Sequence, residues 1–309
     1  MDITAALPTF FITLREGVEA ALVVGIVLAY LKKAGQDRLN AWVYAGIAIG
    51  IAASFLVGIL FEGTMLALDH SEQPYAPVIK PLLEGVFGVV AIVLLSWMLV
   101  WMTRQARSLK GEVEGAVSSA LQQGRSAGWG VFGLILIAVL REGFETVVFI
   151  SAQFQQGWMP VAGAIAGLIG ATVIGFLLFQ LGVKINLRQF FQVMGVLLLL
   201  IVSGLVVGAL RHFNGAISAL AQVDPQYAPL CSGGASCILG AQVWDLSEVL
   251  PDRQFPGVLL KALFGYTQRL YLVQAIAYLA FLGTVGSIYL QSITGSKVLK
   301  SPSQSLTGN

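Results

Sequence analysis

Charged side chains are scarce in this sequence: 18 Lys and Arg and 16 Asp and Glu make up 11% of 309 residues, against about 25% in a typical soluble domain. Hydrophobic residues make up 57%, more than a soluble fold of this size can cover with so few charges. This shortage argues strongly against a soluble enzyme, a nucleic-acid-binding protein and a disordered chain. It indicates an integral membrane protein, in which each rare charge matters individually.

Long apolar runs fill most of the chain. A membrane-spanning helix needs about 20 mostly apolar residues. Seven segments meet this requirement, namely 5–31, 41–61, 81–103, 129–152, 160–183, 190–210 and 270–291. The polar–apolar alternation of a transmembrane β-barrel is lacking, and the first segment lacks the basic start of a signal peptide. We therefore predict an all-α integral membrane protein with about seven transmembrane helices.

The basic residues between the spans set the expected orientation, because cytoplasmic loops are rich in Lys and Arg. With the N-terminus outside, five basic residues face outward, four of them in one long connection. The inner side then holds Lys32, Lys33, Arg38, Arg104, Arg107, Lys110, Arg125, Lys184, Arg188, Lys297 and Lys300. The sequence therefore predicts the N-terminus outside and the C-terminus inside.

Cysteine is almost absent, and both cysteines, Cys231 and Cys237, lie in the long connection 211–269. On this topology the connection faces the oxidising side, which favours a disulfide. A metal-binding thiol pair is the alternative. Of the remaining connections, 104–128 has the spacing of a short amphipathic helix at the inner membrane surface. Residues 293–309 form an inner tail, and its polar end, 301–309, is expected to be disordered.

One charged motif occurs twice inside apolar runs. Residues 15–19 read Arg-Glu-Gly-Val-Glu, and residues 141–145 read Arg-Glu-Gly-Phe-Glu. The segments 1–103 and 129–210 therefore look like two copies of one three-helix unit, with a seventh helix at 270–292. Because each unit has an odd number of spans, the copies are inverted in the membrane. Inverted repeats are typical of transporters whose substrate site lies near the midplane.

The spacing places the charges of each motif on one helix face. Glu16 and Glu19 are three residues apart, and Arg15 lies four residues before Glu19 and can pair with it. The second motif repeats this geometry. An ionised side chain at the bilayer centre costs about 2.5–3.5 kcal/mol on insertion scales, so six of them are hard to explain as accidents.

Four carboxylates with few nitrogen or sulfur neighbours suit a hard cation such as Fe(III), Mn(II), Ca(II) or Mg(II). Arg15 and Arg141 would offset charge and orient carboxylate oxygens. The alternative is a buried ion network that joins helices and binds no ligand. The metal ligands that we predict are Glu16, Glu19, Glu142 and Glu145.

Other sites are less supported. His70 and His212 are the only histidines, which argues against an imidazole site for zinc or nickel and against the Glu-x-x-His pairs of a di-iron oxidase. No G-x-x-x-x-G-K-[ST] motif for ATP occurs. Glu62, in the predicted outer loop, could collect cations at the mouth, although a solvated loop explains it equally well. Glu84, early in the third span, could be a further ligand or a gate on the outer side, although a helix-end carboxylate explains it equally well.

With these motifs, the span count and the outer connection, the chain resembles the high-affinity iron permease family, the oxidase-dependent iron transporters, and most closely its bacterial EfeU-type members. The outer connection contains Trp244-Asp245-Leu246-Ser247-Glu248. Fungal members have D-A-S-E in the comparable loop, so Leu246 replaces Ala and both acids are kept. A role for Asp245 and Glu248 in passing iron inward is a hypothesis. The resemblance covers nearly the whole chain except the tail.

The resemblance implies a non-enzymatic permease that imports iron across the bacterial inner membrane, where lipid surrounds it. Iron is the transported substrate, and no bound organic cofactor is expected. The family implies that a partner oxidises Fe(II) and passes Fe(III) to the permease; in bacteria the partners are commonly a periplasmic haem peroxidase and a periplasmic iron-binding protein. By family, the four motif glutamates bind the iron. An importer of Mn(II) or Pb(II) is the alternative.

Overall fold

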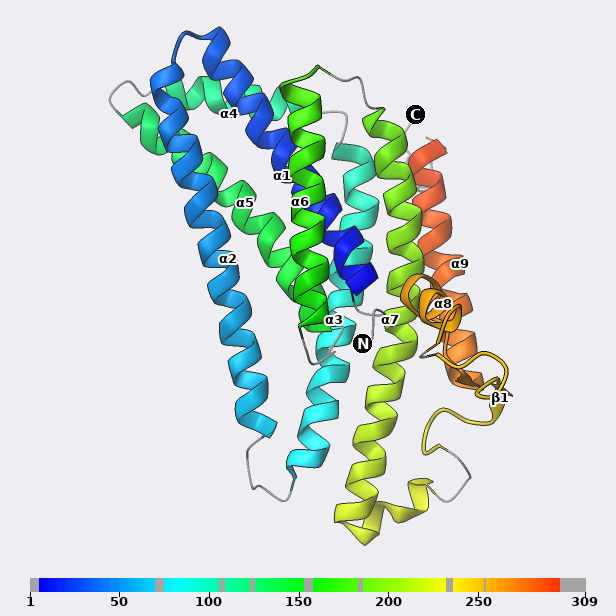
Figure 1. The fold of residues 1–309 in the computed structure, drawn as a ribbon. Coiled ribbons are helices and arrows are strands. Elements are labelled where there is room, and N and C mark those ends of the chain that lie inside the picture. Colours follow the sequence, from blue (N-terminus) through cyan, green and yellow to red (C-terminus); the bar gives the residue numbers. More distant parts are fainter. Residues whose placement is uncertain are drawn as a thin grey trace, which may run out of the picture.

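The long apolar segments form a bundle of helices in this computed structural model (Figure 1). It describes residues 6–69, 75–105, 109–122, 126–152, 158–182, 186–231, 236–252 and 254–294. The first half contains α1 (Ala6–Lys33), the short turn η1 (Asp37–Leu39), α2 (Asn40–Asp69), α3 (Ala76–Gln105) and α4 (Leu109–Gln122). The second half contains α5 (Ala127–Ala152), α6 (Met159–Phe179), α7 (Leu187–Val223) and, after the outer connection, α9 (Leu272–Thr294).

The bundle is that of a multi-pass membrane protein, as the composition predicts. Among the described residues, five helices are long and apolar enough to cross a membrane, namely α2, α3, α6, α7 and α9. The two other long helices, α1 and α5, carry the charged motifs. They have 28 and 26 residues, or about 42 and 39 Å at 1.5 Å per residue, which is long enough to span. Seven spans therefore remain a prediction.

Several helices continue beyond the apolar runs that predict them. The predicted loop position of Glu62 is wrong, because α2 runs on to Asp69 through Leu, Met and Ala, which favour helix. Likewise α7 ends at Val223, where the sequence predicts an end at Leu210. Hydropathy indicates where a helix leaves the apolar interior of the membrane. The helix itself continues for as long as its backbone hydrogen bonds form, so it can end several residues later.

Three pairs of helices pack most extensively: α1 with α6, α2 with α5, and α3 with α7. The α1 helix also packs on α5, which brings the two charged motifs to one place. In Figure 1, α1 and α5 run in opposite directions, as do α2 and α6 and also α3 and α7. These packed pairs and directions determine which side chains can meet in the interior.

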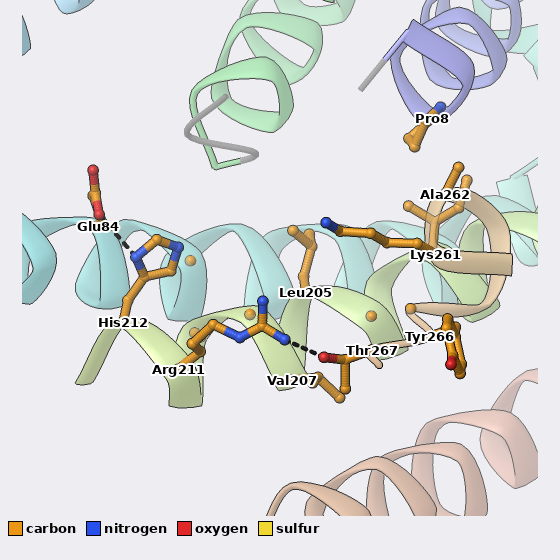
Figure 2. A pocket seen from close by; sticks show the side chains of 16 residues that line it. Pro8, Glu84, Leu205, Val207, Arg211, His212, Lys261, Ala262, Tyr266 and Thr267 are labelled. Atoms are coloured by element: carbon orange, nitrogen blue, oxygen red, sulfur yellow. Dashed lines mark hydrogen bonds and ion pairs between the residues drawn. The ribbon is translucent and has the colours of Figure 1, made fainter. Parts of the chain in front are cut away.

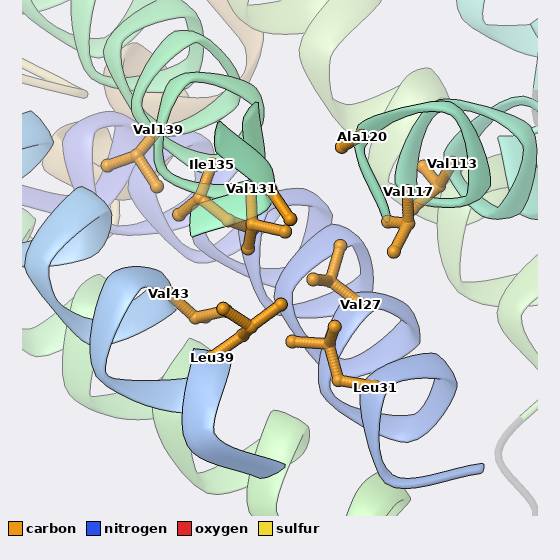
Figure 3. Close-up of a cluster of buried hydrophobic side chains, with 11 residues drawn as sticks. Val27, Leu31, Leu39, Val43, Val113, Val117, Ala120, Val131, Ile135 and Val139 are labelled. Atoms are coloured by element: carbon orange, nitrogen blue, oxygen red, sulfur yellow. The ribbon is translucent and has the colours of Figure 1, made fainter. Parts of the chain in front are cut away.

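The linker helix α4 forms as predicted, but its apolar face is covered by protein. Figure 3 shows Val113 and Val117 of α4 facing Val27 of α1, within a buried cluster that also includes residues of α2 and α5. The sequence predicts that this segment lies along the inner membrane surface. Instead it closes one end of the bundle, on the side where α1 turns into α2 (Figure 1).

The outer connection has a compact structure of its own that the sequence did not predict. It contains the turn η3 (Pro225–Cys231), the strand β1 (Gln242–Asp245), the short helix α8 (Gly257–Phe264) and the strand β2 (Arg269–Tyr271). The two strands pair antiparallel. Cys231 and Cys237 are joined in a disulfide, and α8 packs against α7 and α1. The predicted tail 293–309 lies outside the described residues from position 295 on.

Candidate metal-binding site

The first motif lies in the middle of α1 and is almost completely buried. Arg15 is 3% exposed and Glu16 is 1% exposed. The Arg15 Nη1 atom lies 3.1 Å from Glu16 Oε1, and Arg15 Nε lies 3.3 Å from Glu19 Oε1. One guanidinium therefore contacts both carboxylates of its own motif. The four-residue spacing predicts the pair with Glu19, whereas the contact with Glu16 was not predicted.

The second motif, on α5, has the same internal pairing in a more open setting. Arg141 Nε donates to Glu145 Oε1 at 3.2 Å, and the Arg141 side chain is 38% exposed, against 4% for Arg15. The Arg141 guanidinium also stacks on Trp101 of α3, with its carbon 4.4 Å from the ring centroid. A cation–π contact of this kind holds the guanidinium in place without occupying a carboxylate.

The two motifs meet in one cluster of carboxylates. Ligand oxygens of Glu16, Glu19 and Glu142 all lie within 4.8 Å of one another, and the Arg15 guanidinium interacts electrostatically with all four motif glutamates. Buried charges are normally paired or coordinate a metal. Two guanidiniums against four carboxylates leave an excess of negative charge if all four are ionised, and a cation would supply what is missing.

Several carboxylate oxygens in the cluster are buried without a hydrogen bond. Among the described residues, Oε2 of Glu16, of Glu142 and of Glu145 has no hydrogen-bond partner. Buried polar atoms in folded proteins are nearly always bonded, and an exception calls for an explanation such as an ion. Oxygen atoms that are desolvated, convergent and unbonded are what a hard cation requires.

The glycine in each motif allows a neighbouring helix to approach. A Cβ atom on Gly17 would lie 2.6 Å from the Ala171 Cβ of α6, and one on Gly143 would lie 2.6 Å from the Ser54 Cβ of α2. Such distances are far below van der Waals contact, so each glycine permits a helix contact that alanine would prevent. The motif therefore combines ligands with the packing that encloses them.

The acids predicted to gather cations at the outer mouth have other partners or lie apart from the cluster. Glu84 on α3 contacts the His212 Nδ1 atom of α7 at 2.8 Å. Asp245 pairs with Arg269 at 3.0 Å, and hydrogen bonds from the hydroxyl and the backbone N–H of Ser247 lower the pKa of Asp245 to about 2. Glu248 is exposed in a turn, and the side chain of Glu62 lies outside the described residues.

Two residues of α3 that face the motifs are not predicted from the sequence. Met98 is buried and accepts a hydrogen bond from Arg15 Nη1 at 3.7 Å, and Trp101 lies under Arg141. Both are apolar residues in an apolar span, so composition gives no signal for them. Their spacing of three residues places them on one face of α3, which becomes informative only once the neighbouring helices are known.

The fold and the cluster define a multi-pass helical membrane protein with a buried carboxylate site between two of its helices. The chain matches the iron permease FTR1 family over residues 6–290, and it belongs to that family. It is 48% identical to an uncharacterized protein of Synechocystis over 96% of both chains. It is 35% identical to the ferrous iron permease EfeU of Escherichia coli, over 84% of this chain and 86% of the relative.

A further relative is the ferrous iron permease EfeU of Yersinia pestis, which is 31% identical over 88% of this chain and 89% of its own. No solved structure matches the chain. The family is one of iron permeases, which agrees with the predicted membrane-embedded transporter of iron. The family match extends over both motifs and over the outer connection.

Proposed function

We propose that the protein imports iron across the bacterial inner membrane through the cluster formed by both Arg-Glu-Gly-x-Glu motifs. The observation that carries this proposal is the convergence of Glu16, Glu19 and Glu142, from two distant segments, into one buried set of oxygens in a chain of an iron permease family. Glu145 lies outside this group of three and pairs with Arg141 at 3.2 Å. We propose it as the fourth carboxylate because its Oε2 atom is buried and, among the described residues, has no hydrogen-bond partner.

The proposed path uses the chain's own charges. A cation that reaches the cluster exchanges water for carboxylate oxygens, while Arg15 and Arg141 limit repulsion among the glutamates when the site is empty. Two inverted repeats, residues 1–103 and 129–210, enclose the site and give it access from either side in turn. Inward movement gains about 2.3 kcal/mol per positive charge at a membrane potential of 100 mV, so no nucleotide is required.

The form of the metal is part of the proposal. The relatives from E. coli and Yersinia are called ferrous iron permeases. We propose that a periplasmic oxidase or peroxidase partner oxidises Fe(II) and that the cluster takes the ion as Fe(III), since a set of hard carboxylate oxygens favours the harder ion. Import of Mn(II) or Pb(II) is the second candidate, supported by the same donor set. Competition of each metal with radioactive iron uptake distinguishes them.

The decisive experiment removes the negative charge of one cluster glutamate and keeps the shape of its side chain. Glu16→Gln or Glu142→Gln, expressed in a strain without other iron importers, should lower iron uptake by at least about tenfold. Mutating a residue that only hydrogen-bonds to a metal ligand already lowers metal affinity or activity by about 10–100-fold, so removing a ligand should cost at least as much. The control is Glu112→Gln on α4, an exposed glutamate that should leave uptake unchanged. Wild-type uptake by both cluster variants, at equal amounts in the membrane, would refute carboxylate coordination.

A further inference from the structure

A cavity of about 270 Å³ lies between α3, α7 and the segment that includes α8, and it is separate from the four motif glutamates. Figure 2 shows its lining, with Pro8 at the start of α1 on one side. The α7 helix and the residues after α8 approach closely at one wall. A Cβ atom on Gly204 would lie 2.6 Å from the Gly265 Cα atom. Close backbone packing therefore forms this wall of the cavity.

Nitrogen groups dominate the polar lining. Arg211 and His212 come from α7, Lys261 comes from α8, and Glu84 from α3 is the single carboxylate among the lining residues. In Figure 2 the Lys261 side chain extends from α8 toward the side of the cavity where Arg211 and His212 lie. Donors from two elements therefore converge on one space.

One basic group of this lining forms no ion pair among the described residues. The Glu84 carboxylate is occupied by the His212 imidazole at 2.8 Å, and the Lys261 ammonium contacts Asp252 at 3.1 Å. Arg211 donates to the Thr267 hydroxyl, which is neutral, and among the described residues it forms no ion pair with a carboxylate within 4.0 Å. Arg211 is thus the lining cation whose partners, within the described part of the chain, include no carboxylate.

This donor set does not suit a metal ion, which needs several oxygen or imidazole ligands and repels guanidinium and ammonium groups. It suits an oxyanion, because guanidinium groups present N–H donors in a fork that matches carboxylate and phosphate oxygens. The volume is slightly below the roughly 300–1,000 Å³ of sites for drug-sized ligands, so the ligand is small.

We propose that this cavity binds a small oxyanion, a carboxylate or phosphate group, held by Arg211 with Lys261 and His212 as further donors. Pro8 lies eight residues before Glu16 on α1, which is about 12 Å along the helix axis. A bound anion would therefore place negative charge on the same helix as the carboxylate cluster, where it favours the approach of a cation. The binding itself does not depend on the cluster's metal.

The test measures thermal stability of the purified full-length protein in neutral detergent. Citrate or phosphate should raise the melting temperature by about 2–4 °C relative to chloride at equal ionic strength, because ligands that bind only the folded state stabilise it. Arg211→Gln should abolish this shift. Glu84→Gln should enlarge the shift, because this substitution removes the only carboxylate among the lining residues. A variant that merely folds poorly would not show a larger ligand-induced shift.

Arg269→Gln is the matched control, because Arg269 is also a basic residue of the outer connection but does not line the cavity. A second arm compares nanodiscs of phosphatidylglycerol with those of phosphatidylcholine. A shift that appears only with phosphatidylglycerol and disappears in Arg211→Gln supports the proposal and identifies a lipid headgroup as the oxyanion. No shift from either source, or an undiminished shift in Arg211→Gln, overturns it. Loss of iron uptake in Glu16→Gln bears on the metal site alone.

Discussion

The glycine inside each motif lies between two predicted ligands, but its own role is steric: it lets a neighbouring helix approach. Gly143 on α5 faces Ser54 on α2, whose hydroxyl is bonded to the Gly50 carbonyl at 2.9 Å. That bond holds Ser54 against its own helix, so a methyl group on residue 143 meets a side chain that cannot easily turn away. The helix contact that encloses the carboxylates therefore depends on a missing Cβ atom.

We expect Gly143→Ala to destabilise the protein by about 1–3 kcal/mol, the usual range for overpacking a tight contact, and to lower iron uptake because α2 and α5 are forced apart. Melting temperature in detergent and uptake in cells measure the two effects. Gly133→Ala on the same helix is the control, since nothing lies within 4 Å of a Cβ atom there. Equal behaviour of the two variants would show that the contact is not tight.

At the scale of elements, α1 is held against α6 by backbone contacts at glycines. A Cβ atom on Gly167 would lie 2.6 Å from the Phe10 carbonyl oxygen and 2.8 Å from the Leu14 amide nitrogen. Backbone atoms cannot rotate aside as a side chain does, so the two helix axes must separate if residue 167 gains a side chain. The first motif lies one turn further along α1.

Gly167→Ala should therefore shift α1 relative to α5 and weaken metal binding, in addition to lowering stability. Gly170→Ala is the graded control, because its Cβ atom would meet only the end of the Leu14 side chain, at 2.9 Å, and that methyl group can move. Iron uptake and melting temperature should fall in the order wild type, Gly170→Ala, Gly167→Ala. If Gly170→Ala is the more damaging substitution, the backbone contact is not what positions α1.

The sequence predicts the elements better than it predicts their neighbours. Apolar runs locate the seven long helices, and the motifs stand out because charges are rare there. The α8 helix and the strand pair around Trp244 leave no comparable signal, because short elements lack a hydrophobic period long enough to recognise. Likewise, nothing local shows that Met98 and Trp101 of α3 lie beside Arg15 and Arg141, since that follows from the packing of distant segments.

At the scale of the whole molecule, the packing has the symmetry that an inverted repeat requires. Exchanging α1 with α5, α2 with α6 and α3 with α7 turns the α1–α6 contact into the α5–α2 contact and leaves the α3–α7 and α1–α5 contacts in place. All four contacts are present. This supports the proposed pair of inverted three-helix units around the carboxylate cluster. The two motifs nevertheless differ in exposure, with Arg141 more open than Arg15.

The orientation of this assembly in the membrane is open to direct measurement. The excess of basic residues near the α1–α2 turn predicts that this turn faces the cytoplasm, and the disulfide of Cys231 and Cys237 agrees with an outer location for the opposite end. Because both native cysteines are bonded to each other, single cysteines can be introduced elsewhere as the only free thiols in the chain.

Ala34→Cys in the α1–α2 turn and Val249→Cys in the outer connection place thiols at exposed positions on opposite sides. A membrane-impermeant maleimide should label Val249→Cys on intact spheroplasts and label Ala34→Cys only after the membrane is opened. Val173→Cys on α6 is the control. Val173 is exposed on the surface of the bundle but faces lipid in the proposed arrangement, where thiolate does not form readily, so it should react in neither case. Labelling of Ala34→Cys alone on intact spheroplasts would reverse the predicted orientation and place the cavity around Arg211 on the cytoplasmic side.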